Sequence, residues 1–277
     1  MLFDSYIIKV ENNTNSDNKR DVKEKWLLKM IKIEENKNGS RLHLVNSFSS
    51  DSNNIQENLV LSMLHVSFNT KIYKEWLYHT LLFLYNNCNN ELGLIRGDMY
   101  FKKLEIIANK LYLKQVEKDG FPEKSGTSTP HYLFNYIDFL LWKEKDNAIK
   151  KFTKIVELYI ELKSFSFSTS RNSVEHYLAK NLENRTSANN FENKVSNIDC
   201  LDNLGNLCLI SNNQNSALSD ATPKEKRERY LRKNINNKNY LKCHSLKQAL
   251  MFSYENWNYC TIKEHYEEIK LLLTTVK

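Results

Sequence analysis

The sequence predicts an α+β fold that is mostly α-helical, and three observations support this prediction. The chain has only 6 glycines and 3 prolines in 277 residues, which is typical of helices joined by few tight turns. Apolar residues recur at i, i+3 and i+4 through the middle of the chain, as they do on one face of a helix. Strand-like apolar runs are short and occur towards the C-terminus.

The bulk composition argues against a secreted, disulfide-rich or membrane-spanning protein. A formal net charge of +7 permits nucleic-acid binding without requiring it, because a low-GC genome also enriches lysine and asparagine. The five cysteines are odd in number and show no C-x-x-C spacing, which argues against a disulfide framework or a zinc knuckle. The chain shows no secretion signal and no apolar run near the roughly 20 residues of a membrane helix. We therefore expect a soluble cytoplasmic protein that has reduced thiols and no membrane partner.

Residues 1–163 are expected to form a helical N-terminal body, in which residues 1–58 are irregular and rich in loops. Two apolar stripes at helical spacing follow the irregular part. Their residues are Tyr73, Trp76, Leu77, Thr80, Leu81 and Leu84 in the first stripe and Leu104, Ile107, Ala108 and Leu111 in the second.

A further helix start is clear at Thr129 and Pro130, because threonine caps helices and proline suits the first helical position. His131 and Asp138 in this helix are expected to be structural. Another helix is expected to run from Phe152 to Tyr159. The apolar face of the helix that starts at Pro130 is formed by Leu133, Tyr136, Ile137, Leu140 and Leu141.

Residues 164–277 are expected to form a second domain. The alternating run SFSFS (164–168) predicts a strand, a polar loop covers roughly 181–200, and LDNLGNLCLIS (201–211) predicts a second strand. Three capping boxes predict helix starts after these strands. The boxes span Thr222–Glu225, Ser245–Gln248 and Thr261–Glu264.

The segment VEHYLAKN (174–181) places Glu175 and His176 side by side at a predicted strand end. Taken alone, a histidine at the end of a strand is usually structural. Asn206 at the start of the second strand and Asn215 beyond it change this interpretation, because all four side chains can then form one small site. Adjacent strand residues face opposite sides, so the strand must end or bulge at the pair for both to reach one pocket.

These segments resemble the HNH nucleases, also called ββα-metal or His-Me finger nucleases. They are most similar to the C-terminal nuclease domain of the GmrSD-type modification-dependent restriction enzymes, and the resemblance covers most of residues 60–277. It implies a small ββα-metal (HNH) insert near the C-terminus of the mostly helical α+β fold. The similar segments are VEHYLAKN, LGNLCLISNNQNSALSDATPKEK, Trp257, TIKEHYEEI, LSMLHVSF, YKEWL and TPHYLFNYIDFLLW.

The resemblance implies a role for each residue of the motif. His176 matches the general base that takes a proton from the attacking water, and imidazole, which titrates near pH 6.5, suits this task. Glu175 and Asn215 match two metal ligands, whose oxygen donors favour Mg²⁺ or Mn²⁺ over zinc. The metal would stabilise charge on the scissile phosphate and on its leaving oxygen. Asn206 matches the asparagine of the catalytic motif that fixes its loop by hydrogen bonds.

Contacts to the phosphate backbone are expected from the basic helix that begins near Thr222, although such a helix can also be a solvated face. The chain departs from the family pattern at Ala179, where the family usually has proline, and at His265, where it usually has arginine. His265 can contact phosphate when protonated or can belong to the core. The expected nucleic-acid-binding residues are Lys224, Lys226, Arg227, Arg229 and His265.

We therefore expect a metal-dependent endonuclease that hydrolyses DNA phosphodiester bonds as the cleavage part of a restriction or anti-phage defence system. Proteins of this type usually carry another domain that senses modified DNA and uses nucleotide. Nothing similar precedes residue 60, so we expect that a separate chain supplies it or that the sequence is part of a longer protein. The alternative is a non-catalytic DNA-binding or assembly subunit descended from such a nuclease, which the departures at Ala179 and His265 favour.

Overall fold

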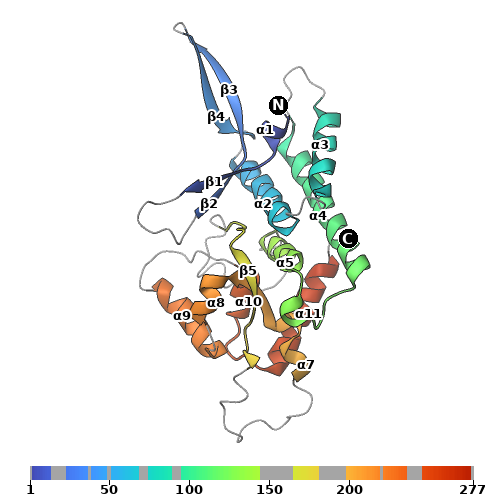
Figure 1. The fold of residues 1–277 in the computed structure, drawn as a ribbon, viewed down its shortest axis with the longest axis vertical. Helices are drawn as coiled ribbons and strands as arrows, with labels where there is room; N and C mark the ends of the chain where they lie inside the picture. Colours follow the sequence, from blue (N-terminus) through green and yellow to red (C-terminus); the bar gives the residue numbers. More distant parts are fainter. Residues whose placement is uncertain are drawn as a thin grey trace, which may run out of the picture. The chain divides into compact units, whose positions relative to one another are not determined.

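The computed structural model describes most of the chain, and the chain divides into two compact units, Met1–Leu113 and Lys114–Lys277. Figure 1 labels the helices and strands of both units. The expected division between residues 163 and 164 differs from this one, because α5 (His131–Lys143) packs against later elements of the second unit. The described residues are 2–13, 23–36, 39–48, 51–68, 74–88, 95–143, 165–180, 198–218, 221–235 and 245–275.

The first unit combines β-hairpins with helices. The hairpins pair β1 with β2 and β3 with β4, both in antiparallel register. The helices α1 and α3 contact each other, and α2 contacts β2. The elements are α1 (Leu2–Tyr6), β1 (Lys9–Asn13), β2 (Lys23–Leu27), β3 (Lys29–Asn36), β4 (Gly39–Asn46), α2 (Asp51–Ser67), α3 (Glu75–Asn87) and α4 (Gly97–Asp119), whose last residues belong to the second unit.

The hairpins correct the expectation that residues 1–58 are irregular. In β3 and β4, Ile31 pairs with Leu44 and Ile33 with Leu42, so apolar side chains alternate along both strands. All four side chains are exposed, and Ile33 and Leu42 are 62% and 65% accessible. The alternating apolar residues therefore lie outside the core. Because polar residues flank them, the composition of this part of the chain did not indicate a hairpin.

The two apolar stripes predicted for the helical body are confirmed. Helix α3 buries Trp76, Thr80 and Leu84, and α4 buries Leu104, Ile107, Ala108 and Leu111. Tyr73 lies outside the described residues. In the described parts of the chain, no helix is long and apolar enough to cross a membrane.

A buried carboxyl in α2 makes the first unit sensitive to pH. Glu57 is fully buried, and this burial raises the pKa of its carboxyl from 4.5 to about 8, with a further contribution from the charge of Asp98. Below about pH 4.5 the carboxyl is protonated in the folded and the unfolded chain alike. Between that pH and about 8 only the unfolded chain ionises, so the free energy of unfolding falls as the pH rises.

We predict that Glu57→Gln removes this pH dependence, because glutamine keeps the shape of the side chain and cannot ionise. At pH 8 the variant should be more stable than the wild type by roughly 2–4 kcal/mol. Hydrogen-exchange protection of α2 at pH 5 and pH 8 measures the effect within the first unit. Glu35→Gln, at an exposed position of β3, is the matched control. Equal pH dependence in wild type and Glu57→Gln would refute the prediction.

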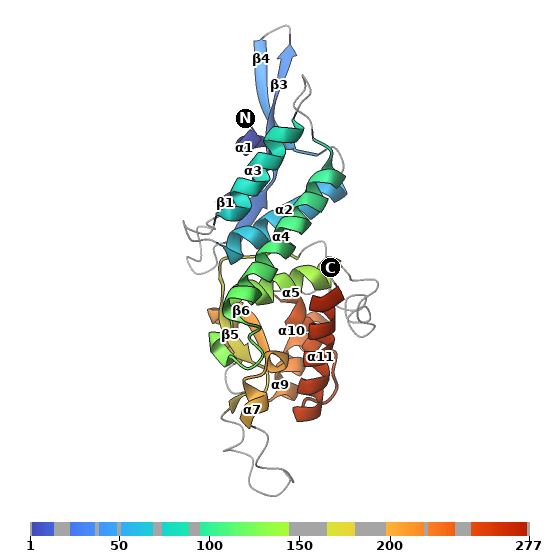
Figure 2. The same cartoon turned by 90° about the vertical axis from the view of Figure 1, so that its right-hand side faces the viewer.

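The second unit surrounds a short antiparallel hairpin with helices. Helix α5 contacts α10 and α11, as Figure 2 shows, and α5 and α10 also contact β6. The elements are the 3₁₀ turn η2 (Gly126–Ser128), α5 (His131–Lys143), β5 (Arg171–His176), α7 (Ile198–Leu201), the 3₁₀ turn η5 (Leu204–Asn206), β6 (Leu207–Ser211), α8 (Asn212–Leu218), α9 (Pro223–Ile235), α10 (Leu246–Met251) and α11 (Tyr259–Thr275).

Helix α5 is the centre of this unit, because every residue from Tyr132 to Leu141 is buried. Asp138 lies on this helix and is fully buried. Its carboxylate forms an ion pair with Arg171 of β5 and accepts a hydrogen bond from the Lys247 N–H of α10 at 2.7 Å. Asp138 is structural, as expected, and it ties α5 to the hairpin and to α10.

The hairpin of the C-terminal region consists of one strand at the predicted place and one elsewhere. The second strand is confirmed as β6, but SFSFS (164–168) is not a paired strand in its described part, and β5 begins at Arg171. The buried Phe165 and Phe167 account for the alternation without strand pairing. The helix expected at Phe152–Tyr159 and most of the loop at 181–200 lie outside the described residues.

The predicted helix caps are confirmed at two of three positions. The Glu225 carboxylate accepts from the Thr222 N–H at 2.7 Å and the Glu225 N–H donates to Thr222 Oγ1 at 3.2 Å, which is a reciprocal capping box. Ser245 accepts from the Gln248 N–H and caps α10. The third prediction, at Thr261, is wrong, because Asn258 Oδ1 accepts from the N–H groups of Cys260 and Thr261 and α11 begins earlier.

Candidate active site

The Glu175–His176 pair lies at the end of the β5–β6 hairpin. The antiparallel ladder stays regular through both residues, with Glu175 opposite Cys208 and His176 opposite Leu207. The register irregularity lies earlier, between Arg171 and Ser173. Of the two expected possibilities, a strand end or a bulge, the structure shows a strand end at the pair. The two side chains leave opposite faces of the strand.

His176 is held by an acidic partner that the sequence analysis did not identify. Nε2 of His176 lies 2.8 Å from Oδ1 of Asp202, and the other carboxylate oxygen accepts from Lys180 Nζ at 2.7 Å. Partial burial alone would raise the pKa of Asp202, but the hydrogen bonds from Lys180 and His176 outweigh it and lower the pKa below its usual value. The carboxylate is therefore ionised and fixes the orientation of the imidazole.

The loop that carries Asp202 is placed by a close approach of backbone. The Gly126 N–H donates to the Asp202 carbonyl at 3.0 Å, and a Cβ at Gly126 would lie 2.4 Å from Asp202 Oδ1. Gly126 also has a φ of +55°, a backbone conformation that residues with a side chain rarely adopt. A larger residue at position 126 would have to displace the Asp202 carboxylate. The sequence signal that could have identified Asp202 as a partner of His176 is its position four residues before Asn206.

Asn206 fixes the turn that follows His176. Its Oδ1 accepts from the Leu178 N–H at 2.9 Å, and its Nδ2 donates to the carbonyls of Leu178 and Leu201, each at 3.0 Å. The indole N–H of Trp257 also donates to Oδ1 at 3.2 Å. Both backbone groups of Leu178 are thus bonded to one side chain, so the turn is held although Ala179 replaces the proline usual in the family.

Glu175 of β5 and the side chain of Asn215, which comes from α8, lie at the same face of β5. Asn215 Nδ2 donates to Ser173 Oγ at 2.8 Å, and Ser173 and Glu175 are two residues apart on the strand. Such neighbours share a face and lie about 6.6 Å apart. Glu175 Oε1 accepts from Lys226 Nζ at 3.0 Å, and the same ammonium donates to the His176 carbonyl at 2.8 Å.

The donor set on this face suits a hard cation. A carboxylate and an amide oxygen are ligands that Mg²⁺ accepts, and Mg²⁺ usually completes its shell with water and substrate phosphate. Among the described residues no group of three or more His, Cys, Asp or Glu side chains is arranged as a metal site. On this face the oxygen donors are the Glu175 carboxylate and the Asn215 amide, and Lys226 already contacts the carboxylate.

The residues expected to bind nucleic acid separate into exposed and buried ones. Lys224 and Arg229 are exposed on α9, and Arg227 is half-buried with its Nε donating to the Phe252 carbonyl at 2.9 Å. Lys226 is 1% accessible and is paired with Glu175. His265 is fully buried, with Nε2 lying 3.2 Å from Lys247 Nζ. The structure therefore favours the core role of His265, and neither it nor Lys226 presents a charge at the surface.

The geometry of the hairpin end and the comparison with known families bear on the class of protein. A hairpin end with an acidic residue beside a carboxylate-held histidine defines a candidate hydrolytic site. Residues 116–270 match the C-terminal domain of the GmrSD restriction endonucleases. Because this match spans more than half of the chain, the protein belongs to that family, and the resemblance to the GmrSD enzymes is confirmed for residues 116–270. No curated protein and no solved structure matches the chain. The family implies a restriction-endonuclease-like function.

Proposed function

We propose that the chain is a metal-dependent endonuclease of the HNH type that hydrolyses DNA phosphodiester bonds at the end of the β5–β6 hairpin. The observation that carries the proposal is the contact of 2.8 Å between His176 Nε2 and Asp202 Oδ1 beside Glu175. DNA as the substrate follows from the family, whose members are restriction endonucleases. The wider role is the cleavage step of a restriction or anti-phage defence system in the cytoplasm, with a separate chain sensing the modification.

His176 acts as the general base in this proposal. Asp202 accepts a hydrogen bond from Nε2–H, so the lone pair of the neutral imidazole is on Nδ1 and is available to accept a proton from water. The carboxylate also stabilises the imidazolium that forms when the proton is taken up. Asn206 acts indirectly, by holding the turn at Leu178 that begins two residues after His176.

Glu175 and Asn215 would hold the metal ion from one face of β5. A bound Mg²⁺ or Mn²⁺ supplies positive charge that stabilises the scissile phosphate and the leaving oxygen. Asn215 Nδ2 is used by Ser173, so its Oδ1 is oriented away from that bond and is the amide atom suited to a cation. The exposed Lys224 and Arg229, with Arg227, would bind backbone phosphates without selecting sequence.

The proposal predicts that cleavage of DNA requires a divalent metal ion. Supercoiled modified and unmodified DNA are incubated with the chain in Mg²⁺, in Mn²⁺ and in EDTA, and nicked and linear products are quantified on gels. We expect products with either metal and none in EDTA, with activity returning when Mg²⁺ is added in excess. Cleavage at an equal rate in EDTA would rule out the proposed metal chemistry.

A non-catalytic DNA-binding or assembly subunit is the second candidate, and one contact favours it. The Lys226 ammonium already neutralises Glu175, which is compatible with a site that binds no metal. This candidate predicts salt-sensitive DNA binding that is unaffected by Glu175→Gln or Asn215→Ala, and no cleavage with any metal ion. The nuclease candidate predicts that both variants lose metal-dependent cleavage and keep DNA binding.

A further inference from the structure

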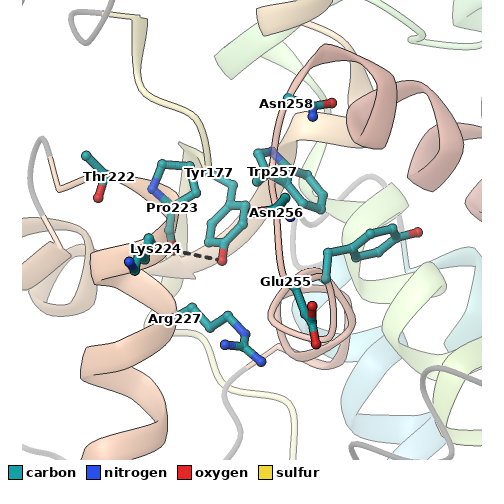
Figure 3. Close-up of a pocket in the computed structure, with 10 residues that line it drawn as sticks. Tyr177, Thr222, Pro223, Lys224, Arg227, Glu255, Asn256, Trp257 and Asn258 are labelled. Carbon is teal, nitrogen blue, oxygen red and sulfur yellow. Dashed lines mark hydrogen bonds between the residues drawn. The ribbon is translucent and has the colours of Figure 1, made fainter. Parts of the chain in front are cut away.

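A pocket of about 350 Å³ begins one residue beyond the Glu175–His176 pair, at Tyr177. It lies entirely in the second unit, between the end of β5, the start of α9 and the segment that joins α10 to α11 (Figure 3). Its volume falls in the range of small-ligand sites. The pocket is lined by Tyr177, Thr222, Pro223, Lys224, Arg227, Tyr254, Glu255, Asn256, Trp257 and Asn258.

One wall of the pocket is aromatic and is held in place by its neighbours. The Trp257 ring meets Tyr177 edge to face with centroids 4.8 Å apart, and it meets Tyr254 in the same way at 5.2 Å. The Tyr177 hydroxyl donates to the Pro223 carbonyl at 3.1 Å, the bond drawn in Figure 3. Trp257 remains partly accessible. Fixed aromatic side chains of this kind are the surfaces on which proteins stack unpaired bases.

The charged residues of the pocket favour an anionic ligand. Lys224 and Arg227 come from the first turns of α9, and Glu255 is the acidic residue among the lining side chains. Lys224 is exposed, and the guanidinium of Arg227 is anchored by the bond from Nε to the Phe252 carbonyl. The partly accessible Trp257 ring beside two cations matches a ligand that combines a ring with a phosphate. Glu255 and Asn256 can accept hydrogen bonds from amino groups of the ring.

We propose that this pocket binds one unstacked nucleotide of the DNA substrate beside the bond that is cut. The base lies against Trp257, which Tyr177 and Tyr254 hold in place, and its phosphate lies at Lys224 and Arg227. A base inside a duplex cannot enter such a pocket, so the nucleotide must leave the stack, as it does in enzymes that extrude bases. The proposal rests on the proposed nuclease function, because Tyr177 directly follows the general base His176.

The test is binding of mononucleotides to the full chain in EDTA, which needs no catalysis. Deoxynucleoside 5′-monophosphates are titrated and compared with deoxyribose 5-phosphate, which carries the same phosphate without a base. We expect the nucleotides to bind about tenfold more tightly, because only they can stack on the aromatic wall. Arg227→Ala should weaken nucleotide binding about tenfold, whereas Lys263→Ala, at an exposed position of α11, should leave it unchanged.

Equal binding of nucleotide and deoxyribose 5-phosphate would overturn the proposal, and so would unchanged nucleotide binding in folded Arg227→Ala. Circular dichroism establishes that the variant is folded, and Lys224→Ala provides a second variant at an exposed position if Arg227→Ala is unfolded. The outcomes for the two proposals differ. If nucleotides bind more tightly than deoxyribose 5-phosphate but no DNA is cleaved, the result supports the pocket and contradicts the nuclease function. If DNA is cleaved but the two ligands bind equally, the result supports the nuclease function and contradicts the pocket.

Discussion

Replacing His176 with alanine is expected to slow DNA cleavage by about 10²- to 10⁴-fold, the usual contribution of a general base. The reason is that His176 is the proposed proton acceptor at the hairpin end and is oriented by Asp202 at 2.8 Å. Rates of plasmid nicking in Mg²⁺, measured under single-turnover conditions, give the effect. Asp202→Asn should also slow cleavage, because it loses the charge that stabilises the protonated imidazole and its amide can hold the imidazole in the wrong tautomer.

The control for His176→Ala is the matched variant His79→Ala in α3, where the histidine is far from the motif in sequence and pairs with Glu75. We expect this variant to cleave at the wild-type rate. The His176→Ala variant should keep its circular dichroism spectrum and its affinity for DNA, because the imidazole contributes one side-chain bond to the loop. Wild-type nicking by a folded His176→Ala variant would show that the general base lies elsewhere.

Asp138→Ala is expected to destabilise the second unit by about 3–5 kcal/mol, the usual result of removing one partner of a buried ion pair. Arg171 is 1% accessible at its side chain and forms an ion pair with Asp138, so the substitution leaves a guanidinium buried without its counter-charge. It also removes the acceptor of the Lys247 N–H at the start of α10. Urea denaturation followed by tryptophan fluorescence measures the loss.

A double variant separates the buried charge from the packing. Asp138→Leu combined with Arg171→Met replaces both ions by apolar side chains and should recover most of the stability, because neither charge is then left alone. Asp119→Ala removes an exposed carboxylate at the end of α4 and should change the stability by less than about 0.5 kcal/mol. A loss below about 1 kcal/mol for Asp138→Ala would mean that water reaches the Arg171 side chain.

The sequence was most informative where a local pattern decides the structure. The capping box at Thr222 and the helix after Pro130 depend on neighbouring residues, and both are observed. The apolar run of β6 is buried on both faces, so it could be recognised as a continuous stretch. The family could likewise be recognised from the motif around His176, because the spacing to Asn206 and Asn215 is a property of the sequence itself.

The features that escaped prediction depend on long-range contacts. Asp202 meets His176 across 26 residues of sequence, through a loop that Gly126 admits, and no local pattern records this contact. Lys226 was expected to bind phosphate from its position in a basic helix, but its ammonium turns to Glu175, 51 residues earlier. His265 was ambiguous because it falls on the apolar side of its helix, and its burial favours the core.

The hairpin strand was misplaced for a related reason. The alternation in SFSFS buries Phe165 and Phe167 but makes no ladder, whereas β5 begins at Arg171 with a mostly polar sequence. Strand pairing at β5 is determined by the partner β6 and by the Arg171–Asp138 ion pair. Side-chain polarity alone could not indicate which of the two segments forms the strand.

The position of a Mn²⁺ ion in crystals of His176→Ala grown with DNA tests the proposed site most directly. The variant keeps both proposed ligands and slows cleavage, and the anomalous signal of manganese locates the ion independently of water. We predict a peak at about 2.0–2.6 Å from a carboxylate oxygen of Glu175 and from Oδ1 of Asn215, next to a phosphate of the DNA. A structure with DNA bound, saturating Mn²⁺ and no ion between Glu175 and Asn215 would contradict the proposed metal-dependent mechanism.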